Sequence, residues 1–314
     1  MLSAAPADGS EPDARAWHYG VFYGLRPLGS DDPVALVWGN CQAESLRCVL
    51  DGGGLATVQM PPVHELVASD LPHVERWLGR AQTLVSQPVR DFYRGLPLGT
   101  NQLAARLGEG AGVVRVPVIR FAGLYPTHAI IRPPSDPGLA PPVVEYHDLR
   151  VLTEAAARRS GLTVADTPLG TEAVLAIAAL SLVALRTREA AHDTVVVSDL
   201  FDAPSFELMR TLNHPGNPIW MELAARVRQW LGLPGHGLDP GRPLLSAVHA
   251  PWAAAVIEAF GLDAEPRDDW IVHGANVEAG QVREAHLRWY EQHPDAVDAG
   301  LARHADALRL LGLA

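Results

Sequence analysis

One apolar segment, residues 34–38, limits the folds open to this chain more than any other feature of its sequence. Its five residues, Val-Ala-Leu-Val-Trp, do not alternate with polar side chains, which is typical of a strand buried on both faces of a parallel sheet. A turn of Gly39 and Asn40 follows directly, and the sequence is then helical from Cys41 to about residue 50. A strand, a sharp turn and a helix in this order predict an α/β protein.

Strand-like and helix-like segments continue to alternate up to about residue 200. Further strands are predicted over residues 55–60, 83–86, 113–119, 143–146 and 194–197. Helices are predicted between them over residues 63–78, 102–107, 153–159 and 172–191. Because strands that alternate with helices form βαβ units, the pattern predicts a mostly parallel, doubly wound sheet with helices on both faces.

Past residue 215 the pattern changes to helices joined by links rich in Pro and Gly. These helices are predicted over residues 219–231, 250–260, 279–292 and 296–311. The first 16 residues are small, acidic and Pro-containing, which favours disorder. We therefore expect a disordered tail over residues 1–16, an α/β core with the catalytic centre over 17–215, and a helical C-terminal part over 216–314 packed on that core.

The formal net charge of −11 argues against general attraction to nucleic acid or to anionic lipid. The two cysteines, Cys41 and Cys48, cannot form a disulfide framework and fit a reducing compartment. The N-terminus lacks the basic and apolar regions of a signal peptide, and the most apolar stretch, 173–185, is shorter than the ~20 residues of a membrane-spanning helix. We expect a cytoplasmic protein without a membrane span or a nucleic-acid partner.

Cys41 lies where open α/β sheets place reactive groups, at the turn between a strand and the next helix. The unpaired N–H groups and the dipole of a helix start favour a nucleophilic thiolate, and the same N–H groups can stabilise an oxyanion. Gly39 allows close backbone approach, while Asn40 and Gln42 place amides beside the sulfur. Alternatively, Cys41 is a small buried apolar residue, which is the role we expect for Cys48.

A nucleophilic cysteine needs a base, and thirteen histidines are available. His214 is the strongest candidate because residues 213–218, Asn-His-Pro-Gly-Asn-Pro, form a rigid polar loop ahead of a helix. Alternatively, the polar side chains of this loop only satisfy local backbone groups. His147 and Asp148 follow a predicted strand and could act as base and orienting acid, or form a turn; His128 is a weaker candidate.

The sequence contains no Gly-x-Gly-x-x-Gly fingerprint, no Walker A segment, no His-Glu-x-x-His and no Cys-x-x-Cys pair. A transition-metal site would have to be assembled from scattered histidines. We therefore expect no metal site.

The tetrapeptide Gly-Asn-Cys-Gln at residues 39–42 resembles the opening signature of the polysaccharide biosynthesis enzyme WcbI family. Later segments resemble the family in the same order: Ser-Gln-Pro-Val-Arg-Asp-Phe-Tyr at 86–93, Val-Pro-Val-Ile-Arg-Phe at 116–121 with Tyr-Pro at 125–126, Tyr-His-Asp at 146–148, Thr-Leu-Asn-His-Pro at 211–215, and the run 246–262. The likeness spans about residues 34–290. It implies a CoA-binding α/β protein that O-acetylates sugars of capsular or exopolysaccharides.

Position by position, the resemblance implies that Cys41, His214 and a third residue form the reactive group. The residues that it places around coenzyme A or acetyl-CoA are Gly39, Asn40, Gln42, Gln87, Arg90, Tyr93 and Arg94. Of these, Arg90 or Arg94 would meet the cofactor phosphates. Their alternative role is to keep the surface soluble.

The family is similar to SGNH-type hydrolases, which also place a nucleophile after the first strand, so the resemblance implies an SGNH-like sheet. This chain lacks their Asp-x-x-His element near the C-terminus, which puts a hydrolase-type triad in doubt. The third member of the reactive group stays open, with Asp148 and Asp199 as candidates.

The leading hypothesis is a CoA-dependent O-acyltransferase, and in particular an acetyltransferase, acting on a sugar hydroxyl. The alternatives are a cysteine-dependent carbohydrate esterase or deacetylase, and a non-catalytic protein that binds CoA or a nucleotide sugar or scaffolds a biosynthetic complex. In the transferase, Cys41 either carries the acyl group while His214 moves protons, or shapes the site while His214 activates the hydroxyl for direct attack. The expected partners are an acyl donor, a carbohydrate acceptor and members of such a complex.

Overall fold

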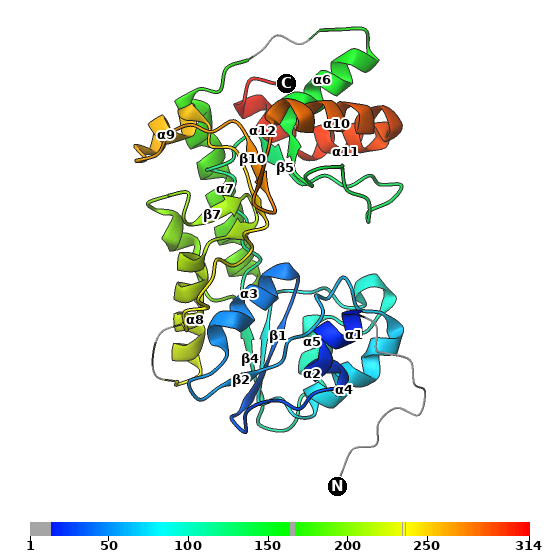
Figure 1. The fold of residues 1–314 in the computed structure, drawn as a ribbon, viewed down its shortest axis with the longest axis vertical. Coiled ribbons are helices and arrows are strands. Elements are labelled where there is room, and N and C mark those ends of the chain that lie inside the picture. The colour runs from blue at the N-terminus through cyan, green and yellow to red at the C-terminus, as the bar shows by residue number, and fades with distance from the viewer. Residues whose placement is uncertain (1–13, 164–166, 234, 236) are drawn as a thin grey trace. The chain divides into compact units, whose positions relative to one another are not determined.

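The computed structural model describes residues 14–163, 167–233, 235 and 237–314. The chain divides into two compact units, which Figure 1 draws in one ribbon. Unit 1 contains the chain up to Val116 and the segment Met221–Asp239, and unit 2 contains Pro117–Trp220 and Pro240–Ala314. Of the tail expected over residues 1–16, residues 1–13 lie outside the described part, whereas residues 14–16 are helical and belong to α1 (Ala14–His18).

Unit 1 is built on a four-stranded parallel sheet with the order β2-β1-β3-β4. Its strands are β1 (Val34–Trp38), β2 (Ala56–Thr57), β3 (Thr83–Ser86) and β4 (Gly112–Arg115). Every residue of the two central strands, β1 and β3, is buried. The continuous apolar run of β1 predicts this, whereas β3 is buried with a polar residue at each end. The α/β fold with a parallel sheet is therefore confirmed.

The helices of unit 1 are α1, α2 (Gly20–Tyr23), α3 (Cys41–Leu50), α4 (Leu71–Leu78) and α5 (Thr100–Ala104). They cover both faces of the sheet because successive side chains of a strand point to opposite faces. Trp38 of β1 belongs to an apolar cluster with Trp77 of α4. Val37 points the other way and lines a small pocket with Ala43 of α3. Figure 1 accordingly shows α3 and α4 on opposite sides of β1.

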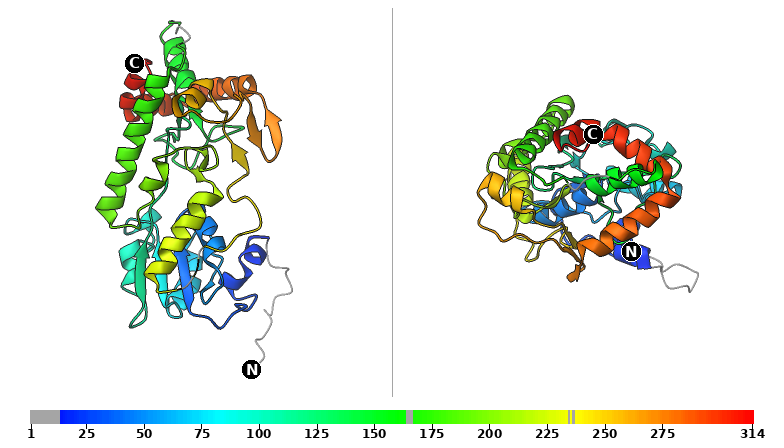
Figure 2. Two further views of the ribbon diagram at one scale, coloured as in Figure 1. Left: turned by 90° about the vertical axis from the view of Figure 1, so that its left-hand side faces the viewer. Right: turned by 90° about the horizontal axis from the view of Figure 1, so that it is seen from above.

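Unit 2 is mainly helical, with short antiparallel strand pairs. Its helices include α6 (Leu149–Arg159), α7 (Thr171–His192), α9 (Ala254–Phe260), α10 (Ala279–Gln292), α11 (Pro294–Arg303) and α12 (Ala305–Leu310). Leu152 of α6, Tyr290 of α10 and Val297 of α11 share one buried apolar cluster, and Figure 1 shows α10 and α11 side by side. In Figure 2, α7 is the long green helix. None of the described helices is long and apolar enough to cross a membrane.

The strands of unit 2 are short and pair antiparallel. They are β5 (His128–Ala129) with β6 (His147–Asp148), β7 (Met209–Thr211) with β8 (His214–Pro215), and the sheet β11-β10-β9 of Ala275–Val277, Trp270–Val272 and Val248–His249. The helical C-terminal part expected from the sequence is confirmed, and it also carries this three-stranded sheet.

The division of the chain between the two units differs from the boundary expected at residue 215. Helix α8 (Asn217–Trp230) begins in unit 2 and ends in unit 1. Its buried Arg228 donates to the carbonyl oxygens of Gly52 (3.0 Å) and Gly53 (2.6 Å), which follow α3. Leu238 N then donates to Val49 O (2.8 Å). The chain therefore returns to unit 1 after residue 220, through contacts that a local sequence pattern does not reveal.

The predicted strands at 143–146 and 194–197 do not form in the described structure. Val143 has a φ of 73°, in the left-handed region, which interrupts extended backbone after two prolines. The N–H of Val197 donates to a carboxylate oxygen of Glu189 (2.7 Å) rather than to a neighbouring strand. Both segments are therefore apolar without joining a sheet.

Candidate functional site

Cys41 is the first residue of α3 and is half-buried, so its side chain is not sealed in the core. The residue before it, Asn40, has an extended backbone and caps the helix by accepting the N–H of Gln42 at 2.9 Å. The turn after β1 therefore presents the cysteine at the N-terminal end of the helix, as expected. Cys48 is also half-buried, with its sulfur 3.6 Å from Glu44 Oε1, and no disulfide joins the two cysteines.

Gln87, which follows β3, holds this turn in place. Its Oε1 accepts the N–H of Asn40 at 2.9 Å, and its Nε2 donates to Gln42 Oε1 at 3.0 Å. Both glutamines are almost fully buried. A side chain on Gly39 would collide with this arrangement, because a Cβ atom there would lie 2.2 Å from Gln87 Oε1. Gly39, Asn40, Gln42 and Gln87 thus form one hydrogen-bonded group, which we call the Gln87 clasp.

The segment after Gln87 is fixed by hydroxyl groups. The hydroxyls of Ser86 and Thr100 lie 2.9 Å apart and contact the carbonyl oxygen of Gln87 at 2.8 and 2.9 Å. Thr100 Oγ1 also accepts the N–H of Val89 at 2.9 Å. The Gln87 clasp therefore rests on a buried polar network that joins the end of β3 to the start of α5.

The three remaining residues predicted to bind CoA lie on the loop after the clasp. Arg94 donates from Nη1 to the carbonyl oxygen of His64 at 2.7 Å, and its backbone φ of 52° is left-handed. Tyr93 is half-buried against the apolar cluster beside β1. Arg90 is exposed and makes no ion pair with the residues that the structure describes. The loops after β2 and β3 therefore meet in unit 1, and both contact the turn that carries Cys41, since Val63 N donates to Gly39 O (2.8 Å).

His214 belongs to β8 in unit 2 and is half-buried. Tyr146 Oη lies nearly equidistant from its ring nitrogens, 3.2 Å from Nε2 and 3.3 Å from Nδ1. The same hydroxyl donates to Asn213 Oδ1 (2.8 Å) and accepts from Thr211 Oγ1 (2.9 Å). Burial lowers the pKa of His214 to about 4, so its imidazole is uncharged at neutral pH. An uncharged imidazole can accept a proton.

The other candidate acid–base residues of the sequence do not surround His214. Asp148 caps α6 by accepting the N–H of Arg150 (2.8 Å), and its carboxylate pairs with the guanidinium of Arg150 (2.6 Å). It makes no hydrogen bond to His214. His147 is fully buried, donates from Nε2 to Ile131 O (3.1 Å) and contacts Tyr290 Oη through Nδ1 (2.5 Å), so it serves the core rather than a reaction. Asp199 lies exposed on a 3-10 helix, Ser198–Phe201.

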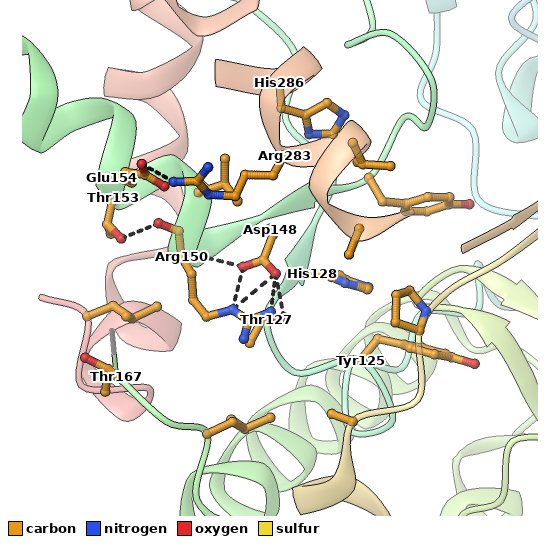
Figure 3. A pocket seen from close by; sticks show the side chains of 18 of the residues that line it. Tyr125, Thr127, His128, Asp148, Arg150, Thr153, Glu154, Thr167, Arg283 and His286 are labelled. Carbon is orange, nitrogen blue, oxygen red and sulfur yellow. Dashed lines mark hydrogen bonds and ion pairs between the residues drawn. The ribbon is translucent and has the colours of Figure 1, made fainter. Parts of the chain in front are cut away.

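Unit 2 also contains a large cavity of about 800 Å³ that the sequence analysis did not predict. It is shown in Figure 3 and lies between β5, β6, α6, β10 and α10. Asp148 and His128 project into it side by side. Its other lining residues include Tyr146, Trp270 and His286. The volume is typical of small-molecule sites, roughly 300–1,000 Å³. We call it the unit 2 cavity.

Opposite charges pair along the wall of the unit 2 cavity. Besides the Asp148–Arg150 pair, the carboxylate of Glu154 binds Arg158 (2.7 Å) and also Arg283. Hydrogen bonds from Arg150 outweigh the effect of burial and hold the pKa of Asp148 below its usual range. The wall of the cavity therefore pairs the carboxylates of Asp148 and Glu154 with guanidinium groups.

His128 lies in the cavity wall within a stack of aromatic rings. Its imidazole is stacked on Trp270, with centroids 4.9 Å apart, and on Tyr125 at 6.0 Å. Its Nδ1 is buried without a hydrogen-bond partner in the described part of the chain. Burial lowers its pKa to about 4. The sequence marked His128 only as a weaker candidate for the base, and Asp148 is another sequence candidate that lines this cavity.

The structure thus brings together one half of the predicted site. Gly39, Asn40, Gln42 and Gln87 gather beside Cys41 in unit 1, whereas His214 belongs to unit 2. The pairing of Cys41 with His214 stays a prediction. Among the described residues, no group of three or more His, Cys, Asp or Glu is arranged to hold a metal ion.

Comparison with known proteins gives two findings. A family model described as "Polysaccharide biosynthesis enzyme WcbI" matches residues 34–236, more than half of the chain. A solved structure of WcbI, described as a novel polysaccharide biosynthesis enzyme in a form without a disulfide bond between coenzyme A and one of its cysteines, matches with a TM-score of 0.72. That match has 20% sequence identity and covers 90% of this chain and 99% of the other. No curated protein sequence matches.

Proposed function

Because this chain belongs to the WcbI family of polysaccharide biosynthesis enzymes, we propose that it is a CoA-dependent O-acyltransferase that moves an acetyl group onto a sugar hydroxyl. The observation that carries the proposal is the half-buried cysteine at the first position of α3, held by the Gln87 clasp. A cytoplasmic location, partners in a biosynthetic complex and acetyl-CoA as the donor are parts of the same proposal.

The surroundings of Cys41 suit thioester chemistry. The helix dipole is positive at this end, which favours a negatively charged sulfur or a developing oxyanion. Gln87 accepts the N–H of Asn40 and Asn40 accepts the N–H of Gln42, so the turn that carries Cys41 is held in one conformation. A preorganised arrangement of this kind stabilises charge that develops during acyl transfer.

Unit 1 also has residues that fit an acyl-CoA. Arg90 is exposed without an ion pair among the described residues, and Arg94 is anchored to His64 O on a loop that contacts the cysteine turn. Guanidinium groups bind phosphate oxygens in bidentate fashion. Acyl-CoA would supply an acyl group activated as a thioester. The coenzyme A named for the structurally similar WcbI protein supports this assignment.

We favour a two-step transfer through Cys41. Its thiolate attacks the thioester carbonyl carbon, the thiolate of CoA leaves, and the acyl group stays on the cysteine as a new thioester. A sugar hydroxyl then attacks this thioester, His214 accepts the hydroxyl proton, and the Cys41 thiolate is regenerated. In the direct route, His214 deprotonates the hydroxyl for attack on the donor and no acyl-cysteine forms.

Intact-protein mass spectrometry after incubation with acetyl-CoA tests the proposal. The unchanged chain and the Cys48→Ala variant should each gain one acetyl group, and Cys41→Ala should gain none. Cys48→Ala is a matched control because Cys48 lies half-buried on the same helix. Acetylation that persists in Cys41→Ala would contradict the role of Cys41.

A thermal shift separates the transferase from its rivals. Acetyl-CoA at ~100 times its dissociation constant adds ~2.7 kcal/mol to the free energy of unfolding, so the midpoint temperature should rise. If neither acetyl-CoA nor CoA raises the midpoint, the transferase proposal fails. Turnover of a chromogenic acetate ester without CoA would then support the esterase.

A further inference from the structure

The unit 2 cavity contains an imidazole whose hydrogen-bonding capacity the protein does not use. His128 Nδ1 is buried without a hydrogen-bond partner within the described part of the chain. Buried polar groups nearly always have a partner, so an unsatisfied one needs an explanation. Stacking against Trp270 and Tyr125 holds the ring in place, which means that it cannot turn away to find another partner. Because Nδ1 is closed to solvent whereas His128 lines the cavity, a ligand in the cavity would hydrogen-bond to the other ring nitrogen, Nε2.

The charge of the cavity indicates what kind of ligand fits. Its lining carries three carboxylates and three guanidinium groups, on Asp148, Glu154, Asp268, Arg150, Arg158 and Arg283. These charges balance, and most of them are engaged in ion pairs within the wall. A site for a polyanion such as CoA requires an excess of positive charge. The balance therefore favours an uncharged ligand.

The hydrogen-bonding groups of the cavity indicate a ligand that both donates and accepts. An uncharged imidazole offers one N–H and one acceptor nitrogen, and His286 shares its Nε2–H between the carbonyl oxygens of Pro142 (3.2 Å) and Val144 (3.1 Å), which leaves its Nδ1 as an acceptor. Carboxylates accept and guanidinium groups donate. Apolar side chains such as Val151 and Val282 line the rest. Hydroxyl groups on an apolar ring frame match this combination.

We propose that the unit 2 cavity binds an uncharged carbohydrate, with His128 hydrogen-bonded to one of its hydroxyl groups. The proposal rests on the proposed function in one respect, because the carbohydrate would be the acyl acceptor. Binding itself requires no acyl donor, so the two proposals can fail separately.

The test uses the full chain and saturation-transfer NMR with methyl glycosides of mannose, galactose, glucose and N-acetylglucosamine, without CoA. At least one glycoside should bind. His128→Phe keeps an aromatic ring between Trp270 and Tyr125 but removes both nitrogens, so it should weaken that binding by roughly tenfold or more. His304→Phe is the matched control, because His304 Nε2 is also buried without a partner but does not line the cavity. It should bind as the unchanged chain does.

Two further measurements distinguish ligand contact from a structural role. The imidazole ¹⁵N shifts of His128 should move when the glycoside is added, and those of His304 should not. Ala279→Trp, at an exposed position of α10 in the cavity lining, should block binding without touching His128, and it serves if His128→Phe does not fold.

Three results would overturn the proposal: no glycoside binds, His128→Phe binds like the unchanged chain, or CoA binding weakens in His128→Phe, which would make the cavity a donor site. Acetylation of Cys41 together with no glycoside binding would leave the transferase standing and reject the carbohydrate site alone. Glycoside binding without Cys41 acetylation would leave the carbohydrate site standing and reject the two-step transfer through Cys41.

Discussion

The Gln87 side chain occupies the space that a side chain on residue 39 would need. A Cβ atom on residue 39 would lie 2.2 Å from Gln87 Oε1 and 2.8 Å from its Cδ. The Gln87 amide cannot move aside without losing its hydrogen bonds to Asn40 N and Gln42 Oε1. Glycine is therefore required at position 39 as long as glutamine occupies position 87.

We predict that Gly39→Ala lowers the free energy of unfolding by about 1–3 kcal/mol, because it forces a side chain into a packed space. In a Gln87→Ala background the same change should cost much less, since the three nearest atoms all belong to the Gln87 side chain beyond Cβ. The coupling between the two positions should be of order 0.5–3 kcal/mol. Urea unfolding of the four proteins measures it.

Gly29→Ala is the control for this cycle, because nothing lies within 4 Å of a Cβ atom there. It should leave stability almost unchanged. Additive effects of Gly39→Ala and Gln87→Ala would show that the clasp does not constrain residue 39.

The sequence could predict the surroundings of Cys41 because they are local in the chain. The strand, the turn and the helix are consecutive, so the N-terminal position of Cys41 on α3 follows from residues 34–50 alone. Gln87 was predicted as a site residue only from the family resemblance. The unit 2 cavity could not be predicted, because its wall combines His128 with Trp270 and His286. Those two residues lie more than a hundred positions from His128 in the sequence.

At the scale of elements, Asp148 illustrates how one residue can look catalytic and act as a cap. It ends β6 and starts α6, where its carboxylate accepts the N–H of Arg150 at 2.8 Å. Such an N-cap satisfies one of the unpaired N–H groups of the first helical turn. The ion pair with Arg150 adds to this cap.

We predict that Asp148→Ala destabilises the protein by about 0.5–2 kcal/mol, through loss of the cap. Asp148→Asn should recover most of that loss, because asparagine caps helices as well as aspartate does and only the ion pair is removed. Thermal unfolding at neutral pH compares the variants. Equal destabilisation by alanine and asparagine would mean that the charge, and not the cap, matters at this position.

Elements were predictable from sequence where one face or both faces are continuously apolar. Strands β1 and β3 and helix α10 form with the predicted bounds. The hairpin of β10 and β11 was missed because its strands are only three residues long, too short to show a periodic pattern. Its turn relies on left-handed backbone at His273 (φ 50°) and Gly274 (φ 81°), and His-Gly is a weak turn signal.

At the scale of the whole molecule, the histidines whose pKa is lowered most lie in unit 2, although burial lowers the pKa of His73 in unit 1 as well. Burial lowers the pKa of His128, His214 and His304 to about 4 and that of His147 to about 3. All four belong to unit 2. In unit 1, Asp70 is different: hydrogen bonds from Arg15 and neighbouring groups outweigh burial and lower the pKa of its carboxyl.

The buried histidines of unit 2 and Asp70 of unit 1 stabilise the protein over different ranges of pH. A histidine with a lowered pKa is uncharged in the native state but takes up a proton in the unfolded state below about pH 6.5. Its contribution is therefore complete above that pH and is lost progressively as the pH falls toward 4. The contribution of Asp70 is complete above about pH 4 and is lost only as the pH falls below that.

Unit 2 should therefore loosen first on acidification. Hydrogen exchange followed by mass spectrometry, corrected for the intrinsic pH dependence of exchange, should show protection of α10 and α11 falling between pH 6.5 and 4.5 while that of β1 and β3 persists. Each of the four histidines can contribute up to about 1.4 kcal/mol per pH unit, so the loss should be steep. In His128→Phe the decline should be shallower, because one proton-binding site of the unfolded state is gone. Simultaneous loss of protection in both units, or an unchanged slope in His128→Phe, would contradict the assignment of acid sensitivity to these buried imidazoles.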